Sequence, residues 1–222
     1  REIIERIRDE KRKPRDFAIL FRTNEQPRAF ESELRRAQVP YVLLGGMSFF
    51  DRKEVRDVLA YLKLLANPRD EVSLLRIINT PARGLGPTMV RRLVETAVRQ
   101  GKTVWELLPH ADQHVALSPA ARAGIRKFRD LLDGLARRAK KQPPALIARE
   151  LISEVGYYDE LARQYPNPDE QQARWASVEE VVNAIGAYQQ RAKQPSMTGF
   201  LRDIALTGPD EGRQKESQLK RD

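Results

Sequence analysis

The chain has 222 residues, 41% of them hydrophobic, which is enough for one large domain or two small ones with a buried core. The 40 Lys and Arg residues outnumber the 31 Asp and Glu residues, and this net charge of +9 favours a polyanionic partner, nucleic acid before an anionic membrane surface. The sequence contains no cysteine, which excludes disulfides, zinc–thiolate sites and thiol catalysis, and no apolar run approaches the roughly 20 residues that span a bilayer.

The sequence also supports expectations about the compartment in which the protein works and about whether the chain is part of a longer protein. The cysteine-free composition is compatible with a reducing cytoplasm, where we expect the protein to work, and no signal peptide is visible. The chain starts at Arg1 inside a charged helical pattern and without an initiator methionine. We therefore expect it to be a piece of a longer protein.

Two apolar segments near the N-terminus have the composition of buried strands. Residues 16–21 and 39–44 flank a predicted helix over 27–37, and another helix is predicted over 2–10. Strand, helix and strand in this order predict a βαβ unit, which is a small piece of an α/β domain.

A polar loop follows the first of these predicted strands and contains Arg22, Thr23 and Asn24. Ligands of open α/β sheets bind outside the carboxyl ends of the strands, and these side chains can bond phosphate, sugar or base. The alternative is a polar loop that only caps its own helix.

Gly45 and Gly46 mark a change in composition and a predicted hinge. Beyond them the strand pattern disappears, and apolar residues recur at helical spacing as far as residue 206. The predicted fold class is therefore mainly α, preceded by the small βαβ piece. We expect helices over 51–67, 71–79, 88–99, 103–108, 120–141, 145–155 and 170–192, another that opens at Tyr157, a last one within 195–206, and a loop over 109–117.

Residues 80–87, Thr-Pro-Ala-Arg-Gly-Leu-Gly-Pro, join two of these predicted helices. Gly84 and Gly86 allow positive φ and a close approach by a foreign surface. The next helix begins with backbone N–H groups that lack internal partners, and these suit a phosphate. Such a hairpin would grip a nucleic-acid backbone through phosphate, with Arg83, Arg91 and Arg92 around it. The alternative is a plain turn between two helices.

Other features carry weaker expectations. His110 and His114 have a spacing that can bind metal, but no supporting acidic pattern accompanies them, so we predict no metal site. The segment 154–180 is acidic and is expected to meet a protein partner or a basic domain. Trp175 is expected to anchor the core, and residues 211–222 are expected to form a flexible tail.

Several stretches together resemble the UvrD/PcrA/Rep DNA helicases. They are Ala18–Arg28, Pro40–Glu54, Tyr61–Pro68 and Arg76–Gly86, in the family's order and spacing. The resemblance covers nearly the whole chain and is strong for residues 16–90. It implies a fragment of a helicase with two RecA-like domains, each carrying an inserted accessory domain.

This resemblance implies an organisation for the chain. Residues 1–44 look like the start of the second RecA-like (2A) domain, residues 45–210 look like its helical 2B insertion, and 211–222 look like the tail. Gly45 and Gly46 would lie near the hinge about which the insertion swivels.

The resemblance also implies roles for residues. Arg22, Thr23 and Asn24 match the loop that holds phosphates of the tracking single strand. The segment Gly84–Gly86, which includes Leu85, matches a helix-hairpin-helix-like element that touches the duplex ahead of the fork. Pro27 and Ala82 depart from the family pattern, which puts part of these contacts in doubt.

The implied parent is an ATP-dependent 3′–5′ DNA helicase of repair or replication that uses ATP and Mg²⁺. The chain itself lacks a G-x-x-x-x-G-K-[ST] loop and an acidic Walker B pair, so it should neither bind nor hydrolyse ATP. Its expected partners are a single-strand/duplex DNA junction, the rest of the helicase and repair proteins on the 154–180 face, and no membrane. An interaction and autoinhibition module with little DNA affinity is the alternative, and an AddA/RecB-type relative also stays open.

Overall fold

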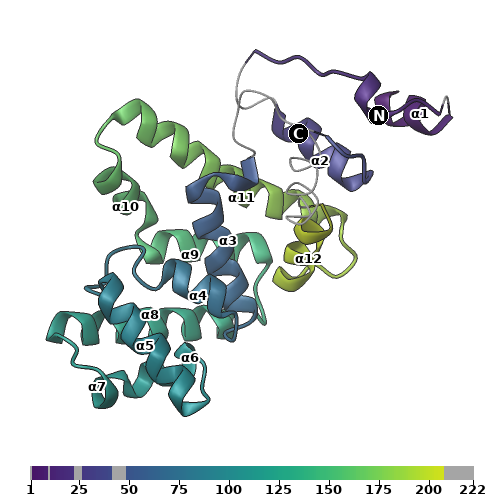
Figure 1. Cartoon of the computed structure of the whole chain (residues 1–222). Coiled ribbons are helices and arrows are strands. Elements are labelled where there is room, and N and C mark those ends of the chain that lie inside the picture. Colours follow the sequence, from purple (N-terminus) through teal and green to yellow (C-terminus); the bar gives the residue numbers. More distant parts are fainter. Residues whose placement is uncertain (1, 10, 23–26, 42–48, 208–222) are drawn as a thin grey trace, which may run out of the picture. The chain divides into compact units, whose positions relative to one another are not determined.

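The structure is a computed structural model that describes residues 2–9, 11–22, 27–41 and 49–207 (Figure 1). Within these ranges the chain is mainly helical and contains no β-strand, which confirms the mainly α part of the predicted fold class. No described helix is long and apolar enough to cross a membrane. The chain forms two compact units, which are the described parts of Arg1–Arg52 with Leu201–Asp222, and Lys53–Phe200.

The first unit consists of short helices. The two helices predicted from periodicity occur as α1 (Glu2–Asp9) and α2 (Pro27–Arg36). Pro27 begins α2, a position at which the missing N–H of proline costs no helical hydrogen bond. Two single 3-10 turns, η1 (Pro14–Asp16) and η2 (Phe49–Asp51), complete the unit.

The predicted strand over 16–21 is wrong. Asp16 ends the turn η1, and residues 17–21 have no strand pairing. Leu20 in this stretch is 93% exposed. Residues 39–41 of the second predicted strand are not in a strand either, and residues 42–44 lie outside the described residues. A strand needs a neighbour for its backbone N–H and C=O groups, and the described residues provide none, so apolar composition alone does not form the βαβ unit.

The second unit is a bundle of helices around α3 (Lys53–Ala66). Ten of the 14 residues of α3 are buried, and the helix packs against α4, α8 and α11, so it forms the centre of the core (Figure 1). The remaining elements of the unit, in chain order, are α4 (Glu71–Ile77), α5 (Pro87–Gln100), α6 (Val104–Leu107), η3 (Leu108–His110), α7 (Ala111–His114), α8 (Pro119–Arg138), α9 (Pro144–Val155), α10 (Tyr157–Gln164), α11 (Pro168–Arg191) and α12 (Met197–Thr207), the last of which continues into the first unit.

Helix ends fall where the sequence places capping residues. Ser118 caps α8, because its hydroxyl accepts a hydrogen bond from the N–H of Ala121 at 3.1 Å. Asp70 caps α4 through the N–H of Ser73 at 3.0 Å. Gly156 ends α9 with a φ of +70°, a conformation that favours glycine.

The predicted loop over 109–117 is partly wrong, since η3 and α7 occupy its residues 109–114. Leu108, Ala111 and Val115 are all buried there. Their i, i+3, i+7 spacing is that of one helical face. Burial of these side chains stabilises two helical segments that are too short to be stable alone.

Two carboxylates near the start of α3 are buried and tie other helices to it. Asp57 accepts hydrogen bonds from the hydroxyl of Tyr157 at 2.9 Å and forms an ion pair with Arg76 at 2.8 Å. Glu54 pairs with Arg174 of α11 at 2.9 Å. Burial, together with the nearby Asp57 charge, raises the pKa of Tyr157 far above its usual range, so its hydroxyl stays a donor. These bonds fix α4, α10 and α11 against α3.

Candidate nucleic-acid interface

Residues 79–86, called the glycine hairpin below, connect α4 to α5. Gly84 and Gly86 are exposed, whereas Leu85 between them is only 1% exposed. Gly84 has a φ of +74°, the left-handed conformation that the sequence predicts for a glycine at a tight turn. The hairpin therefore presents glycine backbone to solvent while its leucine enters the core.

Asn79 holds the hairpin in this shape through its side-chain oxygen. The oxygen accepts hydrogen bonds from the backbone N–H groups of Arg83 at 2.7 Å and Leu85 at 3.2 Å. A single amide thus satisfies two backbone donors that a tight turn would otherwise leave without a partner. The only local signal for this role is the tendency of asparagine side chains to bond nearby backbone groups.

The guanidinium of Arg83 is bonded to other residues of the protein. One of its nitrogens donates to the carbonyl groups of Ile77 and Ile78, at 2.8 Å and 3.2 Å, and the carbon Cζ lies 4.4 Å from the centre of the Phe128 ring. These carbonyls lie at the C-terminal end of α4, where that of Ile77 also accepts a hydrogen bond from the N–H of Thr80 at 3.0 Å. Arg83 therefore closes the C-terminal end of α4 and stacks on α8.

Tyr61 of α3 completes this bracket. Its hydroxyl accepts a hydrogen bond from Arg83 at 2.5 Å and donates one to the carbonyl of Thr80 at 2.5 Å. Burial raises the pKa of Tyr61 to about 12, and the positive charge of Arg83 offsets this only in part. The neutral hydroxyl therefore links both arms of the hairpin to the central helix. Sequence reasoning did not find Tyr61, because nothing in its local pattern indicates this contact.

Two small residues of α8 lie against the hairpin. A Cβ atom on Gly124 would lie 2.9 Å from the carbonyl oxygen of Arg83, and a Cβ atom on Gly84 would lie 3.6 Å from Ala121. The first turns of α8 therefore support the hairpin at close range. A larger side chain at position 124 would push on the backbone of the hairpin.

The start of α5 is open at its N-terminus. Gly86 is the N-cap, with φ −66° and ψ 164°, and no side chain caps the helix. Ser118 has nearly the same conformation at the start of α8, with φ −65° and ψ 156°, and it caps that helix through its hydroxyl. Both residues are followed by proline. The glycine at position 86 thus leaves this helix N-terminus without a side-chain cap, where a serine would stabilise it by only about a few tenths of a kcal/mol relative to glycine.

Arg91 and Arg92 lie one turn into α5 and are exposed. The Nε atom of Arg91 lies 3.9 Å from Glu95, and the side chain of Arg91 is 72% exposed. An exposed pair at this distance contributes little and leaves the guanidinium able to turn to another anion. The first turns of α8, which contact the hairpin, also carry the exposed cations Arg122 and Arg126.

The remaining predicted site residues lie in the first unit. Arg22 is exposed and directly follows the residues that form no strand. Thr23, Asn24, Gly45 and Gly46 lie outside the described residues.

Part of the acidic segment 154–180 is used inside the fold. Glu154 pairs with Arg138, Glu160 pairs with Arg163 at 2.7 Å, and Glu170 pairs with Arg174 at 2.8 Å (the Glu54 partner above). Burial raises the pKa of Glu160, but hydrogen bonds from Arg163 and Gln164 outweigh it and hold the pKa below its usual range. Asp159 and Glu179 remain exposed. Across the described part of the chain, no group of three His, Asp or Glu residues could hold a metal ion.

The sequence is similar to a known protein family and to individual helicases. The family described as UvrD-like helicase C-terminal domain matches residues 1–220. The chain is 32% identical over 94% of its length to the ATP-dependent DNA helicase PcrA of Bacillus subtilis and 33% identical over 93% to PcrA of Staphylococcus aureus. It spans 28% of the length of each of these relatives. The match over nearly all residues shows that the chain belongs to the UvrD-like helicase C-terminal domain family.

Proposed function

We propose that the chain is part of an ATP-dependent 3′–5′ DNA helicase and that it engages DNA without binding ATP itself. The family match and the PcrA relatives, which are named as ATP-dependent DNA helicases, support this proposal. The sequence contains no G-x-x-x-x-G-K-[ST] loop, so ATP and Mg²⁺ belong to other parts of the parent protein.

The proposal assigns parts of the chain to the domains of such a helicase. Residues 1–44 are a segment of the second RecA-like domain, residues 45–210 are a 2B-like insertion with a helix-hairpin-helix-like element, and residues 211–222 are a tail. Gly45 and Gly46 form the hinge of the insertion.

Two sets of residues contact DNA in this proposal. Arg22, Thr23 and Asn24 hold phosphates of the single strand. The glycine hairpin contacts phosphates of the duplex, and the observation that carries this assignment is the uncapped N-terminus of α5 at Gly86. Pro87 has no N–H and Met89 donates its own to the carbonyl of Gly86 at 2.9 Å, so the N–H of Thr88 is the donor that the first turn of α5 offers to an anion. Together with the positive end of the helix dipole it attracts a phosphate, and such contacts position the protein without reading bases.

Some hairpin residues contact DNA in this proposal, and others position the hairpin. Gly84, Gly86, Arg91 and Arg92 are exposed and form the contact surface, called the hairpin surface below. Arg83 and Leu85, which were also expected at the duplex, are assigned positioning roles because the guanidinium is bonded to Tyr61 and to α4, and the leucine is buried.

Fluorescence anisotropy of the 222-residue chain tests this proposal. The chain is titrated with a 3′-tailed duplex, a blunt duplex and a single strand, each over a range of salt concentrations. Tighter binding to either duplex than to the single strand is expected, with affinity that falls as salt rises. Substitution of Arg91 and Arg92 by glutamine should reduce the log–log salt slope by about 0.9 for each lost phosphate contact.

The matched control is Arg149→Gln, which removes an exposed arginine from α9. It should leave the slope unchanged. Equal slopes for the double variant, this control and the unmodified chain would remove the hairpin surface from the mechanism.

A second candidate function is restraint of the helicase through the acidic segment 154–180. Tyr158 and Trp175 favour it, because they form an edge-to-face pair with ring centres 5.0 Å apart, and Tyr158 is 46% exposed. An exposed tyrosine on a half-buried tryptophan, with the exposed carboxylates Asp159 and Glu179 next to them on the same helices, suits a protein surface. In the parent helicase, Tyr158→Ala with Glu179→Lys should raise the unwinding rate if this face restrains the motor. An unchanged rate would contradict it.

A further inference from the structure

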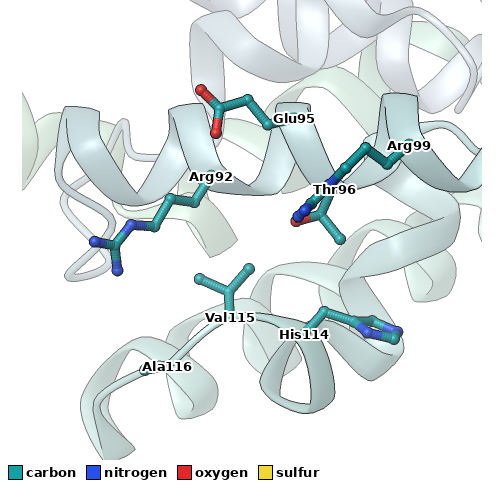
Figure 2. A pocket seen from close by; sticks show the side chains of 7 residues that line it. All are labelled: Arg92, Glu95, Thr96, Arg99, His114, Val115 and Ala116. Atoms are coloured by element: carbon teal, nitrogen blue, oxygen red, sulfur yellow. The ribbon is translucent and has the colours of Figure 1, made fainter.

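A hollow of about 250 Å³ lies beside α5, on the side that faces the end of α7 (Figure 2). We call it the α5–α7 hollow. Three of its lining side chains carry N–H donors suited to an anion, and two others supply a hydroxyl and an apolar wall. The lining residues are Arg92, Glu95, Thr96, Arg99, His114, Val115 and Ala116.

We propose that the α5–α7 hollow is a second anion site that holds one phosphate group of a nucleic-acid backbone. It rests on the proposed function, because Arg92 is shared with the hairpin surface, whereas Arg91 belongs to that surface alone and Arg99 to the hollow alone. The chemistry that defines the site is a phosphate dianion or diester, which a free phosphate compound or a nucleic acid can supply, and the experiment below separates the two.

Arg92 and Arg99 provide the main donors. They are seven residues apart, which is two turns or about 10 Å along α5, so they lie on one face with Thr96 between them. Arg92 has no ion-pair partner among the described residues, and Arg99 donates one hydrogen bond, to the hydroxyl of Thr96 at 3.1 Å. A guanidinium has five N–H donors and matches phosphate geometry, so both side chains can bond an anion between them.

Glu95 is the carboxylate in the lining, and it does not block the site. Figure 2 shows its carboxylate on the side of α5 away from His114 and Val115, whereas Arg92 extends toward the side on which Val115 lies. Glu95 is also the partner of Arg91 at 3.9 Å. The two arginines and the histidine of the lining therefore outnumber its one carboxylate, which points away from His114 and Val115.

His114 closes the opposite wall. Its Nε2 atom lies 3.3 Å from the side-chain nitrogen of Gln100 at the end of α5. When Nε2 accepts this amide hydrogen, the proton of the neutral ring resides on Nδ1, which can donate to a phosphate oxygen. The charged residues of α5 that line the hollow are Arg92, Glu95 and Arg99, and α7 itself carries Asp112, which pairs with Arg122 at 3.8 Å.

The position of the hollow fits a duplex. Thr96 follows Gly86 by ten residues, which places the hollow about 15 Å along α5 from the hairpin. The major groove of B-DNA is about 12 Å wide, so phosphates on its two sides are separated by a similar distance. A duplex can therefore place one phosphate at the hairpin and another at the hollow.

The test uses the 222-residue chain and a blunt duplex. Arg99→Gln should weaken binding about fivefold near 0.1 M salt and reduce the log–log salt slope by about 0.9. Arg99→Lys should keep the slope, since the charge remains, and lose part of the affinity. Arg149→Gln on α9 is the matched control and should change neither quantity. In NMR spectra, the backbone amide signals of Thr96 and Ala116 should shift when duplex is added.

The outcomes separate this inference from the proposed function. Weaker duplex binding in Arg91→Gln with no change in Arg99→Gln would overturn the inference and leave the hairpin in place. If the unmodified chain binds a duplex no more tightly than a single strand, both the inference and the proposed function are overturned. A shift of the Thr96 and Ala116 signals with pyrophosphate but not with duplex would assign the hollow to a free anion and overturn the nucleic-acid assignment.

Discussion

Tyr61 and Arg83 are joined by a 2.5 Å hydrogen bond, although 22 residues separate them in the sequence. The same hydroxyl donates to the carbonyl of Thr80, so the central helix α3 holds the glycine hairpin at two points, Thr80 and Arg83. The shape of the proposed DNA contact surface thus depends on Tyr61, whose buried side chain is not itself part of that surface.

Tyr61→Phe tests this dependence. The variant keeps the ring but leaves an Arg83 donor and the Thr80 carbonyl without their partner. We expect the free energy of unfolding to fall by about 1–3 kcal/mol, measured by urea denaturation. Tyr158→Phe removes an exposed hydroxyl and should cost less than about 0.5 kcal/mol. Equal stability of the two variants would show that the Tyr61 hydroxyl does not hold the hairpin.

The stability of the protein should fall in alkaline solution because of Tyr61. Burial raises its pKa to about 12 from an ordinary value of 10.0, so the unfolded chain loses this proton at lower pH than the folded one. The stabilisation is complete below pH 10 and declines as pH rises from about 10 to about 12. Urea denaturation at a series of pH values should show this decline, and the decline should be smaller in Tyr61→Phe. An identical decline in the variant would contradict the assignment.

Gly124 tests the packing of α8 against the hairpin. A Cβ atom at this position would lie 2.9 Å from the carbonyl oxygen of Arg83, so Gly124→Ala should shift the hairpin and cost about 1–3 kcal/mol. Gly186→Ala is the matched control, because it lies within α11 and has no atom within 4 Å of the added Cβ. This control should stabilise the protein by about 0.5–1 kcal/mol, since glycine is unfavourable inside a helix. Thermal denaturation of both variants measures the contrast, and a stabilised Gly124→Ala would refute the close contact.

Asp57 should be the most sensitive charged residue of the core. Asp57→Asn removes the charge that pairs with Arg76 and receives the Tyr157 hydrogen bond, which leaves a half-buried arginine without its carboxylate. We expect a loss of about 3 kcal/mol, measured by urea denaturation. Arg56→Gln, an exposed neighbour on the same helix, should stay within about 0.5 kcal/mol of the unmodified chain. If Asp57→Asn lowers the free energy of unfolding as little as the control does, the ion pair and hydrogen bond of Asp57 do not stabilise the protein.

The sequence predicts most of the helical unit but not how its side chains meet. Helices such as α8 follow from a cap, a proline and an apolar face, all of which are local signals. The strand predicted over 16–21 fails because a strand needs partners that local composition cannot supply. Gly84 is predictable as a turn residue, whereas the direction of Arg83 depends on Tyr61 and Phe128, which are distant in sequence.

The uncapped N-terminus of α5 is the centre of the functional proposal, and Gly86→Ser tests it most directly. Ser118 shows that a serine in this backbone conformation, followed by proline, caps a helix in the same protein. The variant should therefore be as stable as the unmodified chain or more so, because its hydroxyl can accept a hydrogen bond from the first turn of α5, as the hydroxyl of Ser118 does from Ala121. Duplex affinity, measured by anisotropy at low salt beside urea denaturation, should fall, since the serine side chain then occupies the place of a phosphate. A variant with full stability and unchanged duplex affinity would contradict the proposal that the glycine hairpin grips the DNA backbone.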